Sequence, residues 1–317
     1  MARPPQTRAA AVLAKAEDLR AKADAASTRR AYAADVAAYE AWCAQMGFTA
    51  LPATPQVVGA YLAACGEGYA MSTLRRRVAA IARASGALSA PLDTRHPHIR
   101  ETLRGIGVEY GAPARQAAAL TTDEIRRLIA GCGEDLTGRR DRALLLIGFA
   151  AALRRSELVA LEVADLTAVR GGLKLLIGRS KTDATHEGAF VVLARGQAAE
   201  TCPVRAVQAW LTAASITHGP VFRKVGRGGV VGRHALSGDG VRQILLRRAQ
   251  EAGLKGTLRE PISPHGLRAG FITTAYDHQV PDEQIMGHTR HRSLETMRRY
   301  VRRGKLTGST PAGKLGL

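Results

Sequence analysis

Three groups of side chains in this sequence could act on a phosphate ester. Arg154 stands three residues before Glu157, His265 stands three before Arg268, and Tyr300 lies in a segment crowded with arginines. A guanidinium can hold two phosphate oxygens, an imidazole can move a proton, and a phenol can attack as a nucleophile. Each group alone also fits a structural role, so the elements that position them matter.

These elements are expected to be mostly helical. A helix start is expected at residues 121–124, and residues 143–149 are apolar enough for a core helix that ends shortly before Arg154. Three short apolar runs, 163–169, 173–177 and 189–193, predict a small antiparallel sheet. Helical patterns then return over residues 203–214, 240–252, 264–277, 281–287 and 293–302. The expected fold class is mainly α with a small antiparallel β-sheet, an α+β arrangement.

An earlier group of helices predicts a separate domain. Tyr32, Val36, Tyr39 and Cys43 recur at the spacing of one helix face, and more helices are expected over 55–65, over 72–85 and up to about 105–111. The segment after Gly111 reads as an exposed linker. The expected organisation is a basic arm over 1–26, a helical domain over 27–110, a linker over 111–120 and a second domain over 121–317.

The composition favours a nucleic-acid partner. The formal charge is +19, the basic residues are spread along the chain, and arginine outnumbers lysine. The longest apolar run, residues 143–153, is too short to span a bilayer, so no membrane partner is expected. The four cysteines lie far apart without zinc-ligand spacing, which fits a reducing cytoplasm. The 4% aromatic content gives little support to RNA stacking.

The helix expected over 72–85 is a candidate DNA contact. Leu74, Val78 and Ile81 fall on one face. Four arginines are expected to face elsewhere: Arg75, Arg76, Arg77 and Arg83. A charged helix face can also be merely solvated, and the net charge of the chain favours DNA contact over that alternative.

The order and spacing of these residues resemble the tyrosine recombinase (phage integrase) family over about residues 27–317. The segment 152–158, ALRRSEL, is similar to the family's first arginine box, A-L-R-x-S-E-L. The other matches are Lys181 for a lysine on a hairpin turn, His265 and Arg268 for the H-x-x-R box, and Tyr300 for the nucleophile. The resemblance implies a helical core-binding, DNA-binding domain followed by a catalytic domain.

One histidine of the family pattern has two possible positions here. The family usually carries Gly-His nine residues before the tyrosine, whereas the literal Gly-His of this chain ends at His288, twelve before Tyr300. His291 stands nine before Tyr300 and 23 after Arg268, with Arg290 in place of the usual glycine. His291 is therefore the expected family histidine, and His288 is the alternative.

The resemblance implies that DNA is cleaved and rejoined without a metal, a cofactor or ATP. Tyr300 would attack the scissile phosphate, form a 3′-phosphotyrosine and free a 5′-hydroxyl, so the energy of the broken bond is preserved. Arg154 and Arg268 would stabilise charge on the nonbridging oxygens. His265 is the candidate base, because a phenol is mostly protonated at neutral pH.

Three further residues have roles under the same resemblance. Lys181 would protonate the leaving 5′-oxygen as a general acid. His291 would hydrogen-bond the scissile phosphate. Glu157 would orient its neighbours without touching the substrate.

The implied partners are double-stranded DNA with an inverted-repeat target site and three further copies of the chain, in a homotetramer on two duplexes. The implied location is the bacterial cytoplasm, in association with the nucleoid. The gene would belong to the bacterium, to a phage or to another mobile element. A type IB topoisomerase or a telomere resolvase would share the same chemistry. A DNA-binding protein that has lost catalysis and acts architecturally is the alternative from another class.

Overall fold

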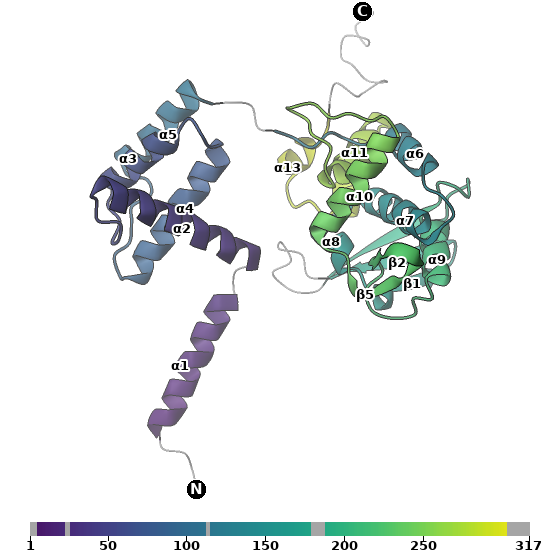
Figure 1. Ribbon diagram of the computed structural model, residues 1–317, viewed down its shortest axis with the longest axis horizontal. Coiled ribbons are helices and arrows are strands. Elements are labelled where there is room, and N and C mark those ends of the chain that lie inside the picture. Colours follow the sequence, from purple (N-terminus) through teal and green to yellow (C-terminus); the bar gives the residue numbers. More distant parts are fainter. Residues whose placement is uncertain (1–4, 23–25, 112–114, 179–187, 303–317) are drawn as a thin grey trace, which may run out of the picture. The chain divides into compact units, whose positions relative to one another are not determined.

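The computed structural model describes residues 5–22, 26–111, 115–178 and 188–302 (Figure 1). The chain divides into two compact units, Met1–Ala114 and Arg115–Leu317, which we describe separately. Lys181 lies outside the described residues. Where the chain is described, no helix is both long enough and apolar enough to cross a membrane.

In its described part, the first unit consists of helices joined by loops, with no strand. Its core contains Tyr39, Val58, Leu62 and Ile99. α2 packs on α4 and α3 packs on α5. The helices are α1 (Pro5–Lys22), α2 (Ala26–Met46), α3 (Pro55–Cys65), α4 (Met71–Ala87) and α5 (Pro97–Glu109).

Arg77 on α4 was predicted to face away from the apolar side of the helix, and this prediction is wrong. Leu74, Val78 and Ile81 are buried as predicted, but Arg77 is buried beside them, with a side chain only 8% exposed. Its Nη1 donates to the Tyr61 hydroxyl at 2.8 Å. Arg77 therefore belongs to the core of the first unit and not to a DNA-facing surface.

The Arg77 guanidinium also lies 3.8 Å from the centroid of the Tyr69 ring, a cation–π contact. Its neighbour Arg76 forms two hydrogen bonds to Asp35 on α2, at 2.7 and 3.1 Å. Arg75 and Arg83 are exposed. Arg75, Arg76 and Arg83 remain on accessible parts of α4.

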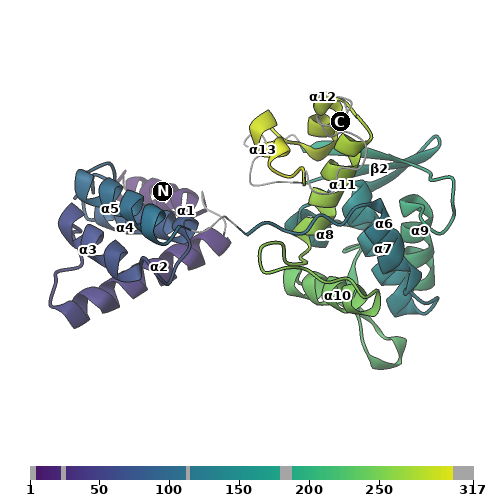
Figure 2. The same cartoon turned by 90° about the horizontal axis from the view of Figure 1, so that it is seen from above.

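The second unit is built around α7, which packs against α6, α9 and α11 (Figure 2). Residues 143–147 of α7 are almost completely buried, which agrees with the predicted core helix. The Thr121 and Glu124 pair closes a capping box at the start of α6. The helices are α6 (Thr122–Ala130), α7 (Leu136–Ala150), α8 (Arg155–Ala160), α9 (Pro203–Ala213), α10 (Gly238–Glu251), α11 (His265–Asp277), α12 (Asp282–Thr289) and α13 (Leu294–Arg298).

The predicted antiparallel sheet is present in the order β1 (Leu166–Val169), β2 (Gly172–Ile177) and β3 (Ala189–Ala194). Leu173 and Leu175 of β2 pair with Leu193 and Val191 of β3, and all four are buried against the core. A second antiparallel pair, β4 (Arg223–Val225) and β5 (Val231–Ala235), was not expected. The mainly α fold with small antiparallel sheets is confirmed.

Residues 116–120 lie directly against α11, which carries the H-x-x-R pair. The Leu120 N–H donates to the Gly266 carbonyl at 3.0 Å. A side chain at Gly270 would place its Cβ 1.8 Å from the Leu120 carbonyl oxygen, and one at Gly266 would lie 2.3 Å from that of Ala118. Two glycines one helical turn apart therefore allow this segment to contact the backbone of α11 closely.

Candidate active site

Arg154 lies where the chain leaves α7 and begins α8. Its backbone N–H donates to Oε2 of Glu157 at 2.8 Å, and its Nη1 donates to Oε1 at 2.6 Å. The Arg154 side chain keeps 28% of its surface exposed, whereas that of Glu157 is 3% exposed. Glu157 thus holds Arg154 from the protein side while the guanidinium stays accessible.

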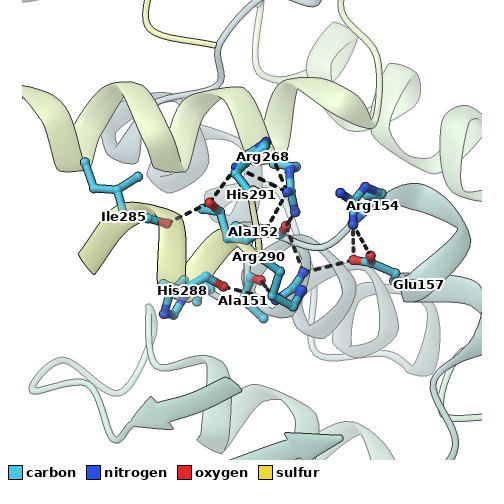
Figure 3. A network of polar contacts seen from close by, with 11 residues as sticks. Ala151, Ala152, Arg154, Glu157, Arg268, Ile285, His288, Arg290 and His291 are labelled. Atoms are coloured by element: carbon cyan, nitrogen blue, oxygen red, sulfur yellow. Dashed lines mark hydrogen bonds and ion pairs between the residues drawn. The ribbon is translucent and has the colours of Figure 1, made fainter. Parts of the chain in front are cut away.

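Arg290 is a second partner of Glu157 and was noticed in the sequence only as a departure from the family's glycine. Its φ of 59° is in the left-handed region, where glycine is ordinarily favoured. Its Nη2 donates to Oε2 of Glu157 at 3.0 Å, and its Nη1 donates to the His288 carbonyl at 3.1 Å (Figure 3). The carboxylate of Glu157 therefore joins two arginines that are 136 residues apart in the sequence.

The charge of Glu157 follows from these contacts. Burial disfavours its ionised form, but the Arg154 N–H and the guanidiniums of Arg290 and Arg154 outweigh that effect. They lower the pKa of Glu157 below its ordinary value. Glu157 is a carboxylate at neutral pH.

Arg268 on α11 has no exposed surface. Its Nη1 donates to the Ala152 carbonyl at 2.6 Å, and its Nη2 donates to the Thr289 carbonyl. Its burial and the charges of Arg154 and Arg290 lower the pKa of Arg268 to about 10, so it remains a cation at neutral pH. Arg268 links the turn before Arg154 to the turn before His291.

Tyr300 lies next to two histidines and Arg268. The centroid of its ring is 5.0 Å from the His265 ring and 5.0 Å from the His291 ring. The Arg268 Cζ lies 6.0 Å from the same centroid. Four of the sequence-predicted site residues, on α11 and in the segments that follow α12 and α13, are therefore brought together.

Tyr300 is not inside a helix, although helical spacing was predicted to continue to residue 302. α13 ends at Arg298, and Tyr300 occupies the turn that follows. The Thr273 hydroxyl donates to the Tyr300 carbonyl at 3.2 Å. The phenol is half-buried.

The two candidate histidines occupy different surroundings. His291 lies beside Arg268, whose Nη2 is 3.2 Å from Nε2 of His291. His288 instead places Nε2 2.7 Å from the Ala150 carbonyl, and its ring stacks on Phe271 at 4.6 Å. His291 is thus the histidine that contacts the group around Tyr300, and His288 is directed toward α7.

Both imidazoles beside Tyr300 are held neutral. Desolvation and the charges of Arg268 and Arg154 lower the pKa of His291 to about 3. The same causes, in the same order, lower the pKa of His265, although the residue keeps exposed surface. A neutral imidazole can accept a proton, so both rings are in the form that a base requires.

Comparisons with known proteins agree with this arrangement. Residues 118–305 match the phage integrase family, and residues 16–84 match the phage integrase N-terminal SAM-like domain. An integrase/recombinase xerD homolog from Selenomonas ruminantium is 33% identical over 289 residues, which cover 90% of this chain and 84% of the relative. The tyrosine recombinase XerD from Xanthomonas axonopodis pv. citri is 30% identical over 198 residues, covering 60% of this chain and 59% of the relative.

Solved structures share the fold at low sequence identity. A lambda integrase tetramer bound to a Holliday junction gives a TM-score of 0.62 at 16% identity, covering 98% of this chain and 84% of that one. The XerH site-specific recombinase in its post-cleavage complex gives 0.57 at 19% identity, covering 78% and 69%. With the family match over the second unit and the xerD homolog over most of the chain, this protein belongs to the phage integrase family of tyrosine recombinases.

Proposed function

We propose that this tyrosine recombinase cleaves and rejoins DNA at specific sites through a covalent 3′-phosphotyrosine at Tyr300, with no metal ion and no ATP. The observation that carries the proposal is the position of Tyr300 between two neutral imidazoles and beside a buried guanidinium. A phenol needs both help with its proton and a cationic surrounding to attack a phosphate anion. The site offers both.

The cations around Tyr300 have separate roles in this proposal. Arg154 is the accessible arginine, and it binds the nonbridging oxygens of the scissile phosphate while Glu157 fixes its orientation. Arg268 has no exposed surface and lies beside the His291 ring, so it stabilises charge from within the protein. A direct contact between Arg268 and the phosphate requires the groups that cover Arg268 to move.

His265 is proposed to take the proton of Tyr300. Its lowered pKa leaves it neutral at neutral pH, which is the state a base needs. Lys181 is proposed to protonate the leaving 5′-oxygen, a role that rests on the resemblance of the sequence because this lysine lies outside the described residues.

The proposed substrate is double-stranded DNA carrying an inverted-repeat site, and the proposed working form is a homotetramer on two duplexes in the bacterial cytoplasm. The formal charge of +19 supports a DNA partner. Among the solved relatives, XerH is bound to a palindromic difH substrate, and lambda integrase forms a tetramer on a Holliday junction. The family match favours a recombinase over a topoisomerase, which could use the same groups.

The test uses a DNA site recovered by selecting random duplexes for binding to the protein. Nicked versions of this site trap a covalent adduct, because the cleaved strand loses the end that would rejoin. Tyr300→Phe should bind the site with unchanged affinity and form no adduct. The control Tyr276→Phe should form the adduct as the unmutated enzyme does. An adduct in Tyr300→Phe would overturn the proposal, and a lack of adduct with the unmutated enzyme would favour a DNA-binding protein without catalysis.

A further inference from the structure

The imidazole of His291 has a hydrogen-bond partner that the reaction scheme does not use. Thr289 is the last residue of α12 and has no exposed surface. Its Oγ1 donates to the Ile285 carbonyl at 2.6 Å and lies 2.6 Å from Nδ1 of His291. Figure 3 shows dashed lines that start at Ile285 and lead toward His291.

The donors and acceptors in these contacts determine the tautomer of the His291 ring. A threonine hydroxyl has one hydrogen, and here it is given to the Ile285 carbonyl. Oγ1 can therefore only accept a hydrogen bond from His291, so Nδ1 must carry a proton. A neutral imidazole has a single N–H, which leaves Nε2 with a lone pair.

The environment of Nε2 agrees with this assignment. The Arg268 Nη2 lies 3.2 Å from Nε2 and 3.4 Å from Nδ1, and a guanidinium has only N–H donors. The two distances are nearly equal and do not by themselves choose between the nitrogens. Because Nδ1 is bonded to Thr289, Nε2 is the nitrogen left to accept from Arg268.

The charged groups around His291 come from several elements. Arg268 and His265 face it from α11, and Arg154 and Arg290 face it from the turns before α8 and after α12. Asp282 and Glu283 at the start of α12, together with Arg292, line the same cavity as His291, whose volume is about 650 Å³. Burial of the ring, together with the cations, lowers the pKa of His291 to about 3, so the ring stays neutral at neutral pH.

We infer that Thr289 is a positioning residue that holds His291 in the tautomer with Nδ1 protonated and with Nε2 as a proton acceptor beside Arg268. The tautomer itself is a property of the free protein. Its value for cleavage rests on the proposed function, in which His291 lies next to the attacking phenol and the scissile phosphate. In that setting the free enzyme presents a lone pair on the Nε2 side of the ring, so the hydrogen bond from His291 to the scissile phosphate that the family resemblance implies can form only after Nε2 takes up a proton.

The tautomer can be read directly from ¹⁵N spectra of protein labelled in its histidines, since protonated and unprotonated ring nitrogens have separate shifts. The His291→Gln variant identifies the signals of His291. The unmutated protein and Thr289→Ser, which keeps the hydroxyl, should show a protonated Nδ1. Thr289→Val, of nearly the same shape, should shift His291 toward the form protonated on Nε2. A protonated Nε2 in the unmutated protein, or an unchanged tautomer in Thr289→Val, would overturn the inference.

Single-turnover cleavage then tests whether Thr289 positions His291 for the reaction or only stabilises the fold. Thr289→Val should cleave about 10-fold more slowly, because Thr289 acts only through the orientation of His291, and loss of a proton-transferring group itself typically costs about 100-fold or more. Its DNA affinity should be unchanged, and Thr289→Ser should regain most of the rate. Normal cleavage by Thr289→Val would refute a role in the reaction. If the unmutated enzyme cleaves no DNA, the proposed function fails, and the spectra still decide the tautomer.

Discussion

At the scale of single residues, the site depends on contacts between side chains far apart in the sequence. Motif spacing predicted Arg154, His265, Arg268, His291 and Tyr300 as one group, and the structure brings these residues together. The partners that hold them could not be predicted in the same way. Arg290 reaches Glu157 across 133 positions, and Arg268 reaches the Ala152 carbonyl across 116.

His291 gives a prediction about stability and pH. Its pKa is about 3 in the folded protein, below the ordinary value of about 6.5 that it regains on unfolding. The unfolded state therefore binds more protons, and the stability that His291 contributes is complete above pH 6.5 and is lost as the pH falls. Between pH 6.5 and 5.5 the loss from this group should be about 1 kcal/mol.

Urea unfolding at several pH values measures this effect. His291→Gln should show a shallower loss of unfolding free energy below pH 6.5 than the unmutated protein. His234→Gln, at an exposed histidine on β5, serves as the control and should leave the slope unchanged. Equal slopes in all three proteins would mean that His291 is not held neutral by its neighbours.

At the scale of elements, apolar periodicity was sufficient to predict most helices and the three-stranded sheet. It predicted α3 with its observed bounds, because an amphipathic face repeats within one helix. The β4–β5 pair was missed since its strands are short and are joined by a glycine-rich turn. α13 ends before Tyr300 because Thr273 holds the backbone that follows the helix. The Thr273 hydroxyl donates to the Tyr300 carbonyl and accepts from the Arg302 N–H.

The run Arg75 to Arg77 shows why charge alone did not predict orientation. Successive helical residues turn by about 100°, so three neighbours cannot share a face. Arg75 is exposed, whereas Arg77 donates to the buried Tyr61 hydroxyl and lies against the ring of the exposed Tyr69. The side toward which each arginine points depends on where the aromatic partners lie.

This difference predicts opposite effects for two alanine variants. Arg75→Ala should leave thermal stability unchanged and, if it contacts one phosphate, lower the slope of log affinity against log salt by about 0.9. Arg77→Ala should destabilise the protein by about 1–3 kcal/mol, because it leaves buried polar groups without partners. Thermal unfolding and fluorescence anisotropy at a series of salt concentrations give both quantities. An Arg77→Ala protein of normal stability would contradict the core assignment.

At the scale of the whole molecule, the segment that enters the second unit is part of the catalytic framework. Residues 116–120 bond to the segment before α11 and to its first turn, through pairs such as Gln116 with Arg259 and Leu120 with Gly266. Arg302, two residues after Tyr300, donates from Nε and Nη2 to the Ala117 carbonyl at 3.3 and 3.0 Å. The entry to the unit and the segment that carries Tyr300 are therefore held by the same set of contacts.

Gly270 tests this close packing. A Cβ there would overlap the Leu120 carbonyl, so Gly270→Ala should destabilise the protein by about 1–3 kcal/mol and slow cleavage. Gly287→Ala on α12 is the control, since no atom lies within 4 Å of its Cβ. That variant should keep or slightly raise the unfolding free energy. Equal stability of the two variants would show that the segment does not need the glycine.

In the proposed reaction, Tyr300 becomes covalently linked to the 3′ side of the cleaved strand. The most direct measurement is to trap the adduct on a nicked substrate, digest protein and DNA, and identify the modified peptide by mass spectrometry. We expect a single modified peptide in which Tyr300 carries a nucleotide through its 3′-phosphate. A modification on Tyr276, or a link through a 5′-phosphate, would contradict this mechanism.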